Sequence, residues 1–281
     1  MIFPKLIVPK VGEDISNGKP IEAFIKDKIE LQLLSTDMLK YKDFVKAWID
    51  KYPRIETYIL HIPFLFVTVF DIYSSQKLQR EFNVFVSDMI KLSMQYKKHF
   101  HILFHMATPM KTFEYCGGVE YVKYLDRLIQ DTDVNFLVEN STFTLENRTK
   151  EGGPFYQLVK QIDSPKIRCC FDICHNQINK NLYQSEYDLP ADIGKYTKSI
   201  HFSSTLNHDG FIDKKTHGRA HENIGTLIDD LEFLQNHGFD LNTTFLVTEI
   251  NEDDYVKRPD LIKELKNLEQ IRLSLLGNTS D

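Results

Sequence analysis

The chain has few cysteines, and their spacing does not form a disulfide framework. Its 281 residues include four, of which three fall in one apolar segment: they are Cys116, Cys169, Cys170 and Cys174. Cysteine in such a segment behaves as a small hydrophobic residue. We therefore expect reduced core thiols in a cytoplasmic protein.

Long apolar runs are also absent. No stretch reaches the roughly 18 apolar residues that a membrane span requires. The N-terminus MIFPKLIVPKVGEDIS lacks the basic flank and the apolar segment of a signal peptide. We expect no association with a membrane.

The sequence has no excess of positive charge. A formal net charge of −6 argues against a polybasic surface for nucleic acid, although an enzyme acting on DNA can carry divalent cations in its own site. Internal repeats and low-complexity segments are missing as well. With 42% hydrophobic residues, the chain can bury one large core, so we expect a single domain over residues 1–281 with a frayed tail from about residue 276.

What the sequence does contain is eight short apolar runs separated by amphipathic helical patterns. Runs of this kind are typical of strands buried on both faces. They are KLIVP near residue 5, ELQLLS near 30, YILHIPF near 58, HILFHM near 101, NFLVENS near 135, IRCCFDI near 167, KSIHFSS near 198 and TFLVTEI near 244. The helical signal is weakest in residues 176–196. Eight strands alternating with helices predict an α/β protein folded as one (β/α)8 barrel.

Six of these runs end in a side chain that can bind a metal. The six are His61, His105, Glu139, Asp172, His201 and Glu249. A charge at the end of a buried strand costs several kcal/mol, roughly, unless it is paired or coordinates a cation. Because the C-terminal ends of barrel strands meet at one mouth, where active sites lie, the pattern predicts a metal centre there.

The residue types suit zinc or manganese, which accept imidazole nitrogen and carboxylate oxygen. Asp172 and His175 form a D-x-x-H pair that sends two side chains from one strand end. The number of candidate ligands indicates two or three ions with a shared carboxylate. Ions about 3.5–4 Å apart are typical of phosphodiester hydrolysis.

Other polar residues are expected to be structural. Ser203 and Ser204 lack the G-x-S-x-G elbow of a nucleophilic serine. His99 and His101 fall at the entrance of their strand, away from the mouth. The histidines that we do not assign to the site are His99, His101, His208 and His237.

The motifs FLVENS, CFDICH, SIHFSS, RAHENIG and FLVTEI resemble the signature strands of the xylose isomerase-like barrel superfamily. They resemble in particular its DNA-repair branch, endonuclease IV and the UV damage endonucleases, over roughly residues 58–250. The resemblance implies one metal held by His61, His105 and Glu139. It implies that Glu139 bridges to a second, held by Asp172, His201 and Glu249. A third would be bound by His175 and His221.

The chain departs from both groups around the third metal. Endonuclease IV has an aspartate two residues before the histidine that matches His221, where this chain has Arg219. The UV damage enzymes have a lysine two residues before the histidine that matches His201, where this chain has Ser199. Their N-terminal tyrosine motif is also missing. We therefore expect the third ion to be the weakest, with Asp213 or His217 of the same loop as the candidates to complete it.

Two enzymatic functions follow from this ligand set. The first is a metal-dependent phosphodiesterase that cleaves damaged DNA, with Glu139 and Glu249 as catalytic residues and Arg219 and His217 in contact with the substrate. The second is a sugar isomerase or epimerase with one metal on Glu139, Asp172, His201 and Glu249, in which the two glutamates move a proton next to a carbonyl. His61 and His105, which a single-metal isomerase does not need, favour the nuclease. A barrel used for binding alone is the third possibility.

Overall fold

Eight parallel strands form a closed barrel in the order in which they occur in the chain. The computed structural model describes residues 3–63, 68–141, 152–183, 189–204, 218–251 and 257–277. The strands are β1 (Leu6–Gly12), β2 (Lys28–Gln32), β3 (Thr57–His61), β4 (His99–Met106), β5 (Val134–Asn140), β6 (Ile167–Asp172), β7 (Thr197–Phe202) and β8 (Phe245–Thr248). Pairing of β1 with β8 closes the ring. The predicted (β/α)8 barrel and all eight predicted strands are confirmed.

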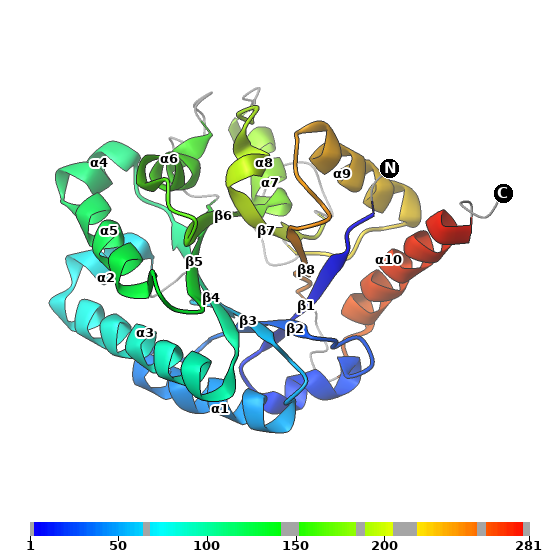
Figure 1. Ribbon diagram of the computed structural model, residues 1–281. Helices are drawn as coiled ribbons and strands as arrows, with labels where there is room; N and C mark the ends of the chain where they lie inside the picture. Colours follow the sequence, from blue (N-terminus) through cyan, green and yellow to red (C-terminus); the bar gives the residue numbers. More distant parts are fainter. Residues whose placement is uncertain are drawn as a thin grey trace.

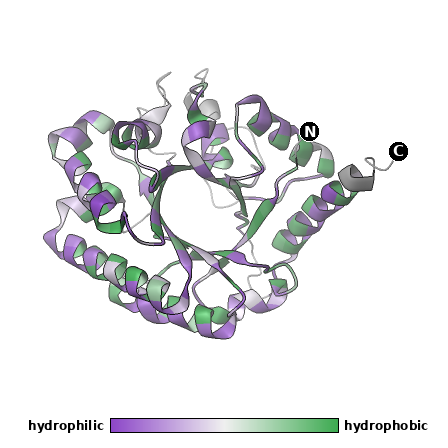
Figure 2. Cartoon of the chain, viewed as in Figure 1, coloured by the Kyte–Doolittle hydropathy of each residue, from purple (hydrophilic) through white to green (hydrophobic). Residues whose placement is uncertain are grey.

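Helices surround the barrel (Figure 1). The long ones are α1 (Tyr41–Lys51), α3 (Gln76–Tyr96), α5 (Gly118–Ile129), α6 (Gly153–Ile162), α7 (Ile173–Tyr183), α9 (Ile224–Asn236) and α10 (Pro259–Gly277). Short elements are η1 (Ile15–Ile21), η2 (Met38–Lys40), α2 (Val69–Ser74), α4 (Met110–Tyr115) and α8 (Ile193–Tyr196). Hydrophobic and hydrophilic residues alternate along the outer helices (Figure 2). No helix among the described residues is long and apolar enough to cross a bilayer.

Alternation along the strands divides the apolar core into two parts. One large cluster lies between the strands and the helices, and it includes Tyr58, Leu60, Ile102 and Phe104. A smaller cluster lies inside the barrel because its members alternate with those of the first: Val8, Ile59, Leu103, Leu137, Cys170, Phe245 and Val247. The barrel is therefore filled by side chains below its mouth.

The weak helical signal in residues 176–196 nevertheless corresponds to a helix, α7, which begins directly after β6. Its polar residues Asn176 and Asn179 are buried, and the Asn179 side chain donates to the carbonyl of Ser141 at 3.1 Å. These buried amides interrupt the apolar pattern of the segment, which weakens its helical signal in the sequence. Residues 143–153 and 203–225 connect a strand to the following helix, and most of each segment lies outside the described residues, as do residues 278–281 of the tail.

Candidate metal centre

A polar layer lies directly above the apolar layer inside the barrel. Successive inward-facing residues of a strand are two positions apart, so the residue two positions after the last member of the inner apolar cluster on each strand lies nearer the mouth. This step leads from Val8, Ile59, Leu103, Leu137, Cys170 and Val247 to Lys10, His61, His105, Glu139, Asp172 and Glu249. The structure thus brings together the six predicted strand-end residues, since His201 of β7 lies among them.

One donor set consists of two imidazoles and a carboxylate. The Nε2 atoms of His61 and His105 lie 3.3 Å apart. Glu139 Oε2 is 3.5 Å from the first and 3.4 Å from the second. All three side chains are buried. Burial lowers the pKa of His105 to about 3, so this imidazole is neutral, as a metal ligand must be.

A second donor set shares Glu139 with the first. It comprises Glu139, Asp172, His201 and Glu249, whose donor atoms lie within 4.8 Å of one another. His201 Nδ1 is its centre, 3.2 Å from Glu139 Oε1, 2.6 Å from Glu249 Oε2 and 3.9 Å from Asp172 Oδ2. The two oxygens of Glu139 therefore face different donor sets.

Asp172 is held in place by its neighbours. The Asn140 side chain donates to the Asp172 carbonyl at 3.0 Å and accepts from its N–H at 2.6 Å. The N–H of His175 donates to Asp172 Oδ1 at 2.7 Å, while Oδ2 faces the second donor set. His175 lies at the edge of the cluster, with Nδ1 2.9 Å from the Asn140 carbonyl and 3.5 Å from Glu139 Oε1.

Two site residues were not found from the sequence, Lys10 of β1 and Glu30 of β2. Lys10 Nζ lies 2.6 Å from Glu249 Oε1 and 3.1 Å from Glu30 Oε1. Glu30 is fully buried and lies 3.0 Å from both His61 Nδ1 and His201 Nε2. The segment KIELQ did contain a signal for Glu30. Its polar residues Lys28, Glu30 and Gln32 alternate with apolar ones, which predicts that the polar residues share the face of the strand that points into the barrel.

The charge balance of the site fits divalent cations. Four carboxylates converge here, those of Glu30, Glu139 and Asp172, which are fully buried, and that of Glu249 at the mouth. Burial opposes the charge of His201, but Cys170 and the carboxylates of Glu30, Glu139 and Glu249 outweigh it and raise the pKa of His201 well above its usual value. Without a metal, His201 therefore binds a proton in this site. The nitrogen and oxygen donors around it suit zinc or manganese.

The structure does not bring His221 into this cluster. Its ring packs on Phe202 with centroids 4.7 Å apart. Its Nε2 lies 3.0 Å from Asp230 of α9, and its Nδ1 is hydrogen-bonded to Glu264 of α10. The predicted third metal would therefore need a different arrangement of His221.

The other predicted residues of the mouth are only partly described. Arg219 pairs with Ser204 through two backbone hydrogen bonds of 2.7 and 2.9 Å, which form an isolated antiparallel bridge after the end of β7. His217 and Asp213 lie outside the described residues. Among the histidines expected to be structural, His101 is buried at the entrance of β4 against Phe245, and His237 caps α9.

The contacts of His221 predict a pH-dependent stability. Burial lowers the pKa of this imidazole, but hydrogen bonds to Asp230 and Glu264 outweigh it and raise the pKa from 6.5 to about 9. The folded state therefore binds the proton more tightly than the unfolded chain, a stabilisation that is complete below pH 6.5 and lost as the pH rises through about 9. It amounts to about 3 kcal/mol.

Urea unfolding of the wild type and His221→Gln at about pH 6 and about pH 10 measures this effect. The stability difference between the two proteins should shrink by about 3 kcal/mol at the higher pH. A difference that is independent of pH would contradict the assignment of a charged His221.

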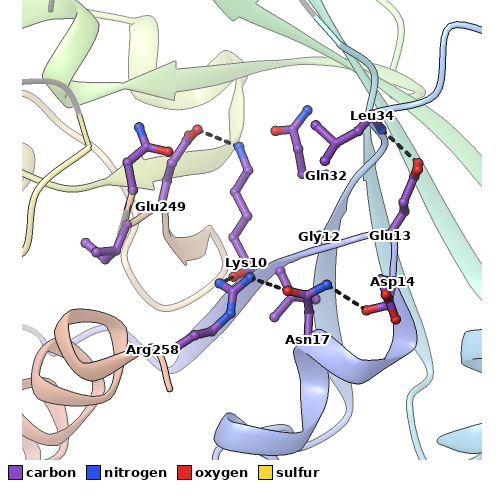
Figure 3. A pocket seen from close by; sticks show the side chains of 12 residues that line it. Lys10, Gly12, Glu13, Asp14, Asn17, Gln32, Leu34, Glu249 and Arg258 are labelled. Carbon is purple, nitrogen blue, oxygen red and sulfur yellow. Dashed lines mark hydrogen bonds and ion pairs between the residues drawn. The ribbon is translucent and has the colours of Figure 1, made fainter. Parts of the chain in front are cut away.

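A cavity of about 480 Å³ opens beside the donor sets. Figure 3 shows that the Lys10 side chain extends through it to the carboxylate of Glu249. Its walls come from the ends of β1 and β2 and from the segment after β8, with Asn17, Gln32, Leu34 and Asn251 among the lining residues. This volume suits a small molecule.

Buried Arg258 supports the floor of this cavity. Its guanidinium donates to the Lys10 carbonyl at 3.4 Å and to Asn17 Oδ1 at 3.1 Å. It thereby ties the end of β1 and η1 to the start of α10 (Figure 3). The backbone that carries Lys10 is fixed in this way from a segment distant in sequence.

Comparison with known proteins gives matches by structure alone. No protein-family model and no curated protein sequence matches the chain. D-psicose 3-epimerase with D-tagatose, from Clostridium cellulolyticum H10, is 14% identical with a TM-score of 0.57, covering 96% of this chain and 97% of that one. A xylose isomerase domain-containing protein from Salmonella typhimurium LT2 is 14% identical with a TM-score of 0.58, covering 98% and 99%.

A third similar structure is a protein from Thermus thermophilus that was soaked with ZnCl2. It is 15% identical with a TM-score of 0.62, and the match covers 94% of this chain and 98% of that one. At these identities the likeness concerns the fold. The chain therefore shares its (β/α)8 fold with these three proteins.

Proposed function

We propose that this protein is a divalent-metal-dependent isomerase or epimerase of a small sugar. The observation that carries the proposal is the position of the cavity, which shares Glu249 with the donor set of Glu139, Asp172 and His201. A sugar in this cavity would lie beside the carboxylate of Glu249 and the metal that this donor set would hold. The fold that the chain shares with sugar epimerases supports the same assignment.

The site residues have two roles, metal binding and proton transfer, and the two glutamates take part in both. Glu139, Asp172, His201 and Glu249 hold the metal, which when bound polarises a sugar oxygen as a Lewis acid and makes the neighbouring C–H more acidic. Burial opposes ionisation of Glu139 and Glu249, but the neighbouring histidines, and Lys10 for Glu249, outweigh it and lower the pKa of both carboxyls. Both are therefore ionised, which is the state in which a carboxylate can accept a proton.

The reaction conserves atoms and needs no redox partner. One glutamate takes the proton from the carbon next to the carbonyl, which leaves an enediolate on the sugar. In an isomerase the proton is returned to the former carbonyl carbon while the hydroxyl proton moves from one enediolate oxygen to the other. In an epimerase it is returned to the opposite face of the same carbon. Polar residues of the cavity, Asn17, Gln32 and Asn251, are placed to bind hydroxyl groups, and the exposed Leu34 to cover an apolar edge.

Solvent exchange tests this function directly. The manganese-loaded protein is incubated with a panel of ketohexoses and aldoses in D2O, and deuterium at the carbon next to the carbonyl is measured by NMR. We expect metal-dependent incorporation for at least one sugar. No exchange with any sugar of the panel, together with cleavage of DNA that contains abasic sites, would contradict the proposal.

The phosphodiesterase remains a second candidate because of one specific observation. His61, His105 and Glu139 form the first donor set, which is compact and which a single-metal isomerase does not need. A dinuclear site would clamp both the attacking and the leaving oxygen of a phosphodiester. The number of bound ions therefore separates the two candidates.

Replacing His61 or His105 by alanine is expected to lower the metal content by about one ion per chain if the site is dinuclear. Elemental analysis of the wild type and of both variants gives the answer. Arg219→Ala is a suitable control because the proposed donor sets do not include this residue. If both histidine variants keep the full metal content of the wild type, the dinuclear site is wrong and the single-metal enzyme is favoured.

A further inference from the structure

Glu30 contacts histidines of both donor sets from below. Its side chain is fully buried. One carboxylate oxygen, Oε1, lies 3.0 Å from His61 Nδ1, and the other, Oε2, lies 3.0 Å from His201 Nε2. The register of β2 places Glu30 beside Ile59, two residues before His61 and so one layer deeper in the barrel. Glu30 is thus too deep to line the cavity, and its two oxygens each face an imidazole.

The two histidines present different nitrogens to Glu30 and to the site. His61 directs Nδ1 to Glu30 and Nε2 to Glu139. His201 directs Nε2 to Glu30 and Nδ1 to Glu139 and Glu249. A carboxylate only accepts hydrogen bonds, so each contact is satisfied when the nitrogen that faces Glu30 carries the proton. The lone pair of each ring then points into its donor set.

We propose that Glu30 is a positioning residue that fixes His61 and His201 in opposite tautomers and so prepares both donor sets at once. The rings lie side by side, 5.2 Å apart at an interplanar angle of 27°, and share the one carboxylate. A movement that breaks one hydrogen bond therefore disturbs the other ring. Glu30 belongs to neither of the two donor sets that contain Glu139, although its oxygens and the facing nitrogens of His61 and His201 also lie within 4.8 Å of one another. This inference holds for both candidate functions, because it concerns the histidines and not the substrate.

Lys10 offers a competing arrangement that the test must separate. Its Nζ lies 2.7 Å from His61 Nδ1. An ammonium only donates, so a hydrogen bond from Lys10 to this nitrogen would place the His61 proton on Nε2, facing Glu139. Lys10 has carboxylate partners in Glu249 at 2.6 Å and Glu30 at 3.1 Å. These carboxylates take two of the three ammonium protons and hold Lys10 in place without a hydrogen bond to His61, so His61 Nδ1 can donate to Glu30 when the third proton is directed elsewhere.

NMR of the histidine ring nitrogens in the zinc-loaded wild-type protein tests the proposal without any variant. Long-range ¹H–¹⁵N spectra distinguish a protonated Nδ1 from a protonated Nε2. We expect the proton on Nδ1 in His61 and on Nε2 in His201. A His61 with its proton on Nε2, or a His201 with its proton on Nδ1, would overturn the proposal.

Glu30→Gln provides the second test. A glutamine keeps the shape but offers one acceptor oxygen, and its amide donates toward the other histidine, which must then move its proton to the nitrogen that faces the donor set. We expect the affinity for Zn²⁺, measured by chelator competition on the full chain, to fall about 10- to 100-fold, with a changed tautomer in one of the two rings. A zinc affinity within about twofold of the wild type, with both tautomers retained, would contradict the coupling.

Glu264→Gln is the matched control. Glu264 is equally buried and also accepts from a histidine, His221, which lies outside the donor sets. The same chemical change there should leave zinc affinity within about twofold of the wild type. Because both readouts are independent of turnover, an absence of sugar conversion would contradict the proposed function and leave this inference intact.

Discussion

Glu139→Gln is expected to lower both metal binding and activity, the latter by about 10²- to 10⁴-fold if Glu139 also moves a proton. Glu139 Oε1 faces His201 at 3.2 Å, and Oε2 faces His105 at 3.4 Å and His61 at 3.5 Å. Each donor set therefore loses an anionic ligand through one substitution. The neutral amide keeps the volume of the side chain above an intact apolar layer, so the fold should persist.

Elemental analysis, circular dichroism and turnover of the same preparation measure these effects together. Loss of metal with an unchanged far-UV spectrum is the expected result. Glu264→Gln again serves as the control for removing a buried carboxylate elsewhere. Wild-type metal content and turnover in the Glu139 variant would show that the site has been assigned to the wrong residues.

Lys10→Met should strongly destabilise the metal-free protein. Burial opposes the charge on Lys10, but the carboxylates of Glu249, Glu30 and Glu139 outweigh it and raise its pKa. Removing this ammonium leaves buried carboxylates without their cationic partner. Removing one member of a buried ion pair typically costs about 3–5 kcal/mol. We expect a loss of this order in the free energy of unfolding when a chelator is present.

Metal should reduce this loss, because divalent cations bind to the same carboxylates in the folded state and stabilise it by mass action. Urea unfolding with EDTA and with Mn²⁺ gives the two values for each protein. Lys42→Met is the control, since Lys42 is an exposed lysine paired with Asp88 at 3.2 Å. Its substitution should change stability by less than about 1 kcal/mol. A Lys10 variant as stable as this control in EDTA would refute the role of Lys10 as the internal cation.

The sequence determined the barrel and most of its mouth. Eight apolar runs separated by amphipathic segments leave little choice but a parallel sheet covered by helices, and a parallel barrel places every strand end at one mouth. A histidine or acid at the end of a buried run was therefore enough to identify His61, His105 and Glu139. The same argument identified Asp172, His201 and Glu249, because it needs only the local pattern and the direction of the strand.

Only the tertiary structure decided how these side chains are paired. Glu30 meets His201 from 171 residues away, and Lys10 meets Glu249 from 239 residues away, so no local pattern contains either contact. Barrel closure creates them by setting β1 beside β8 and by directing alternate residues of every strand to the axis. His221 likewise lies outside the cluster and contacts Asp230 and Glu264, because helices α9 and α10 bring two carboxylates to its ring. Strand patterns determine which residues face the mouth, whereas the proton and metal partners of each residue depend on distances that exist only after the barrel has closed.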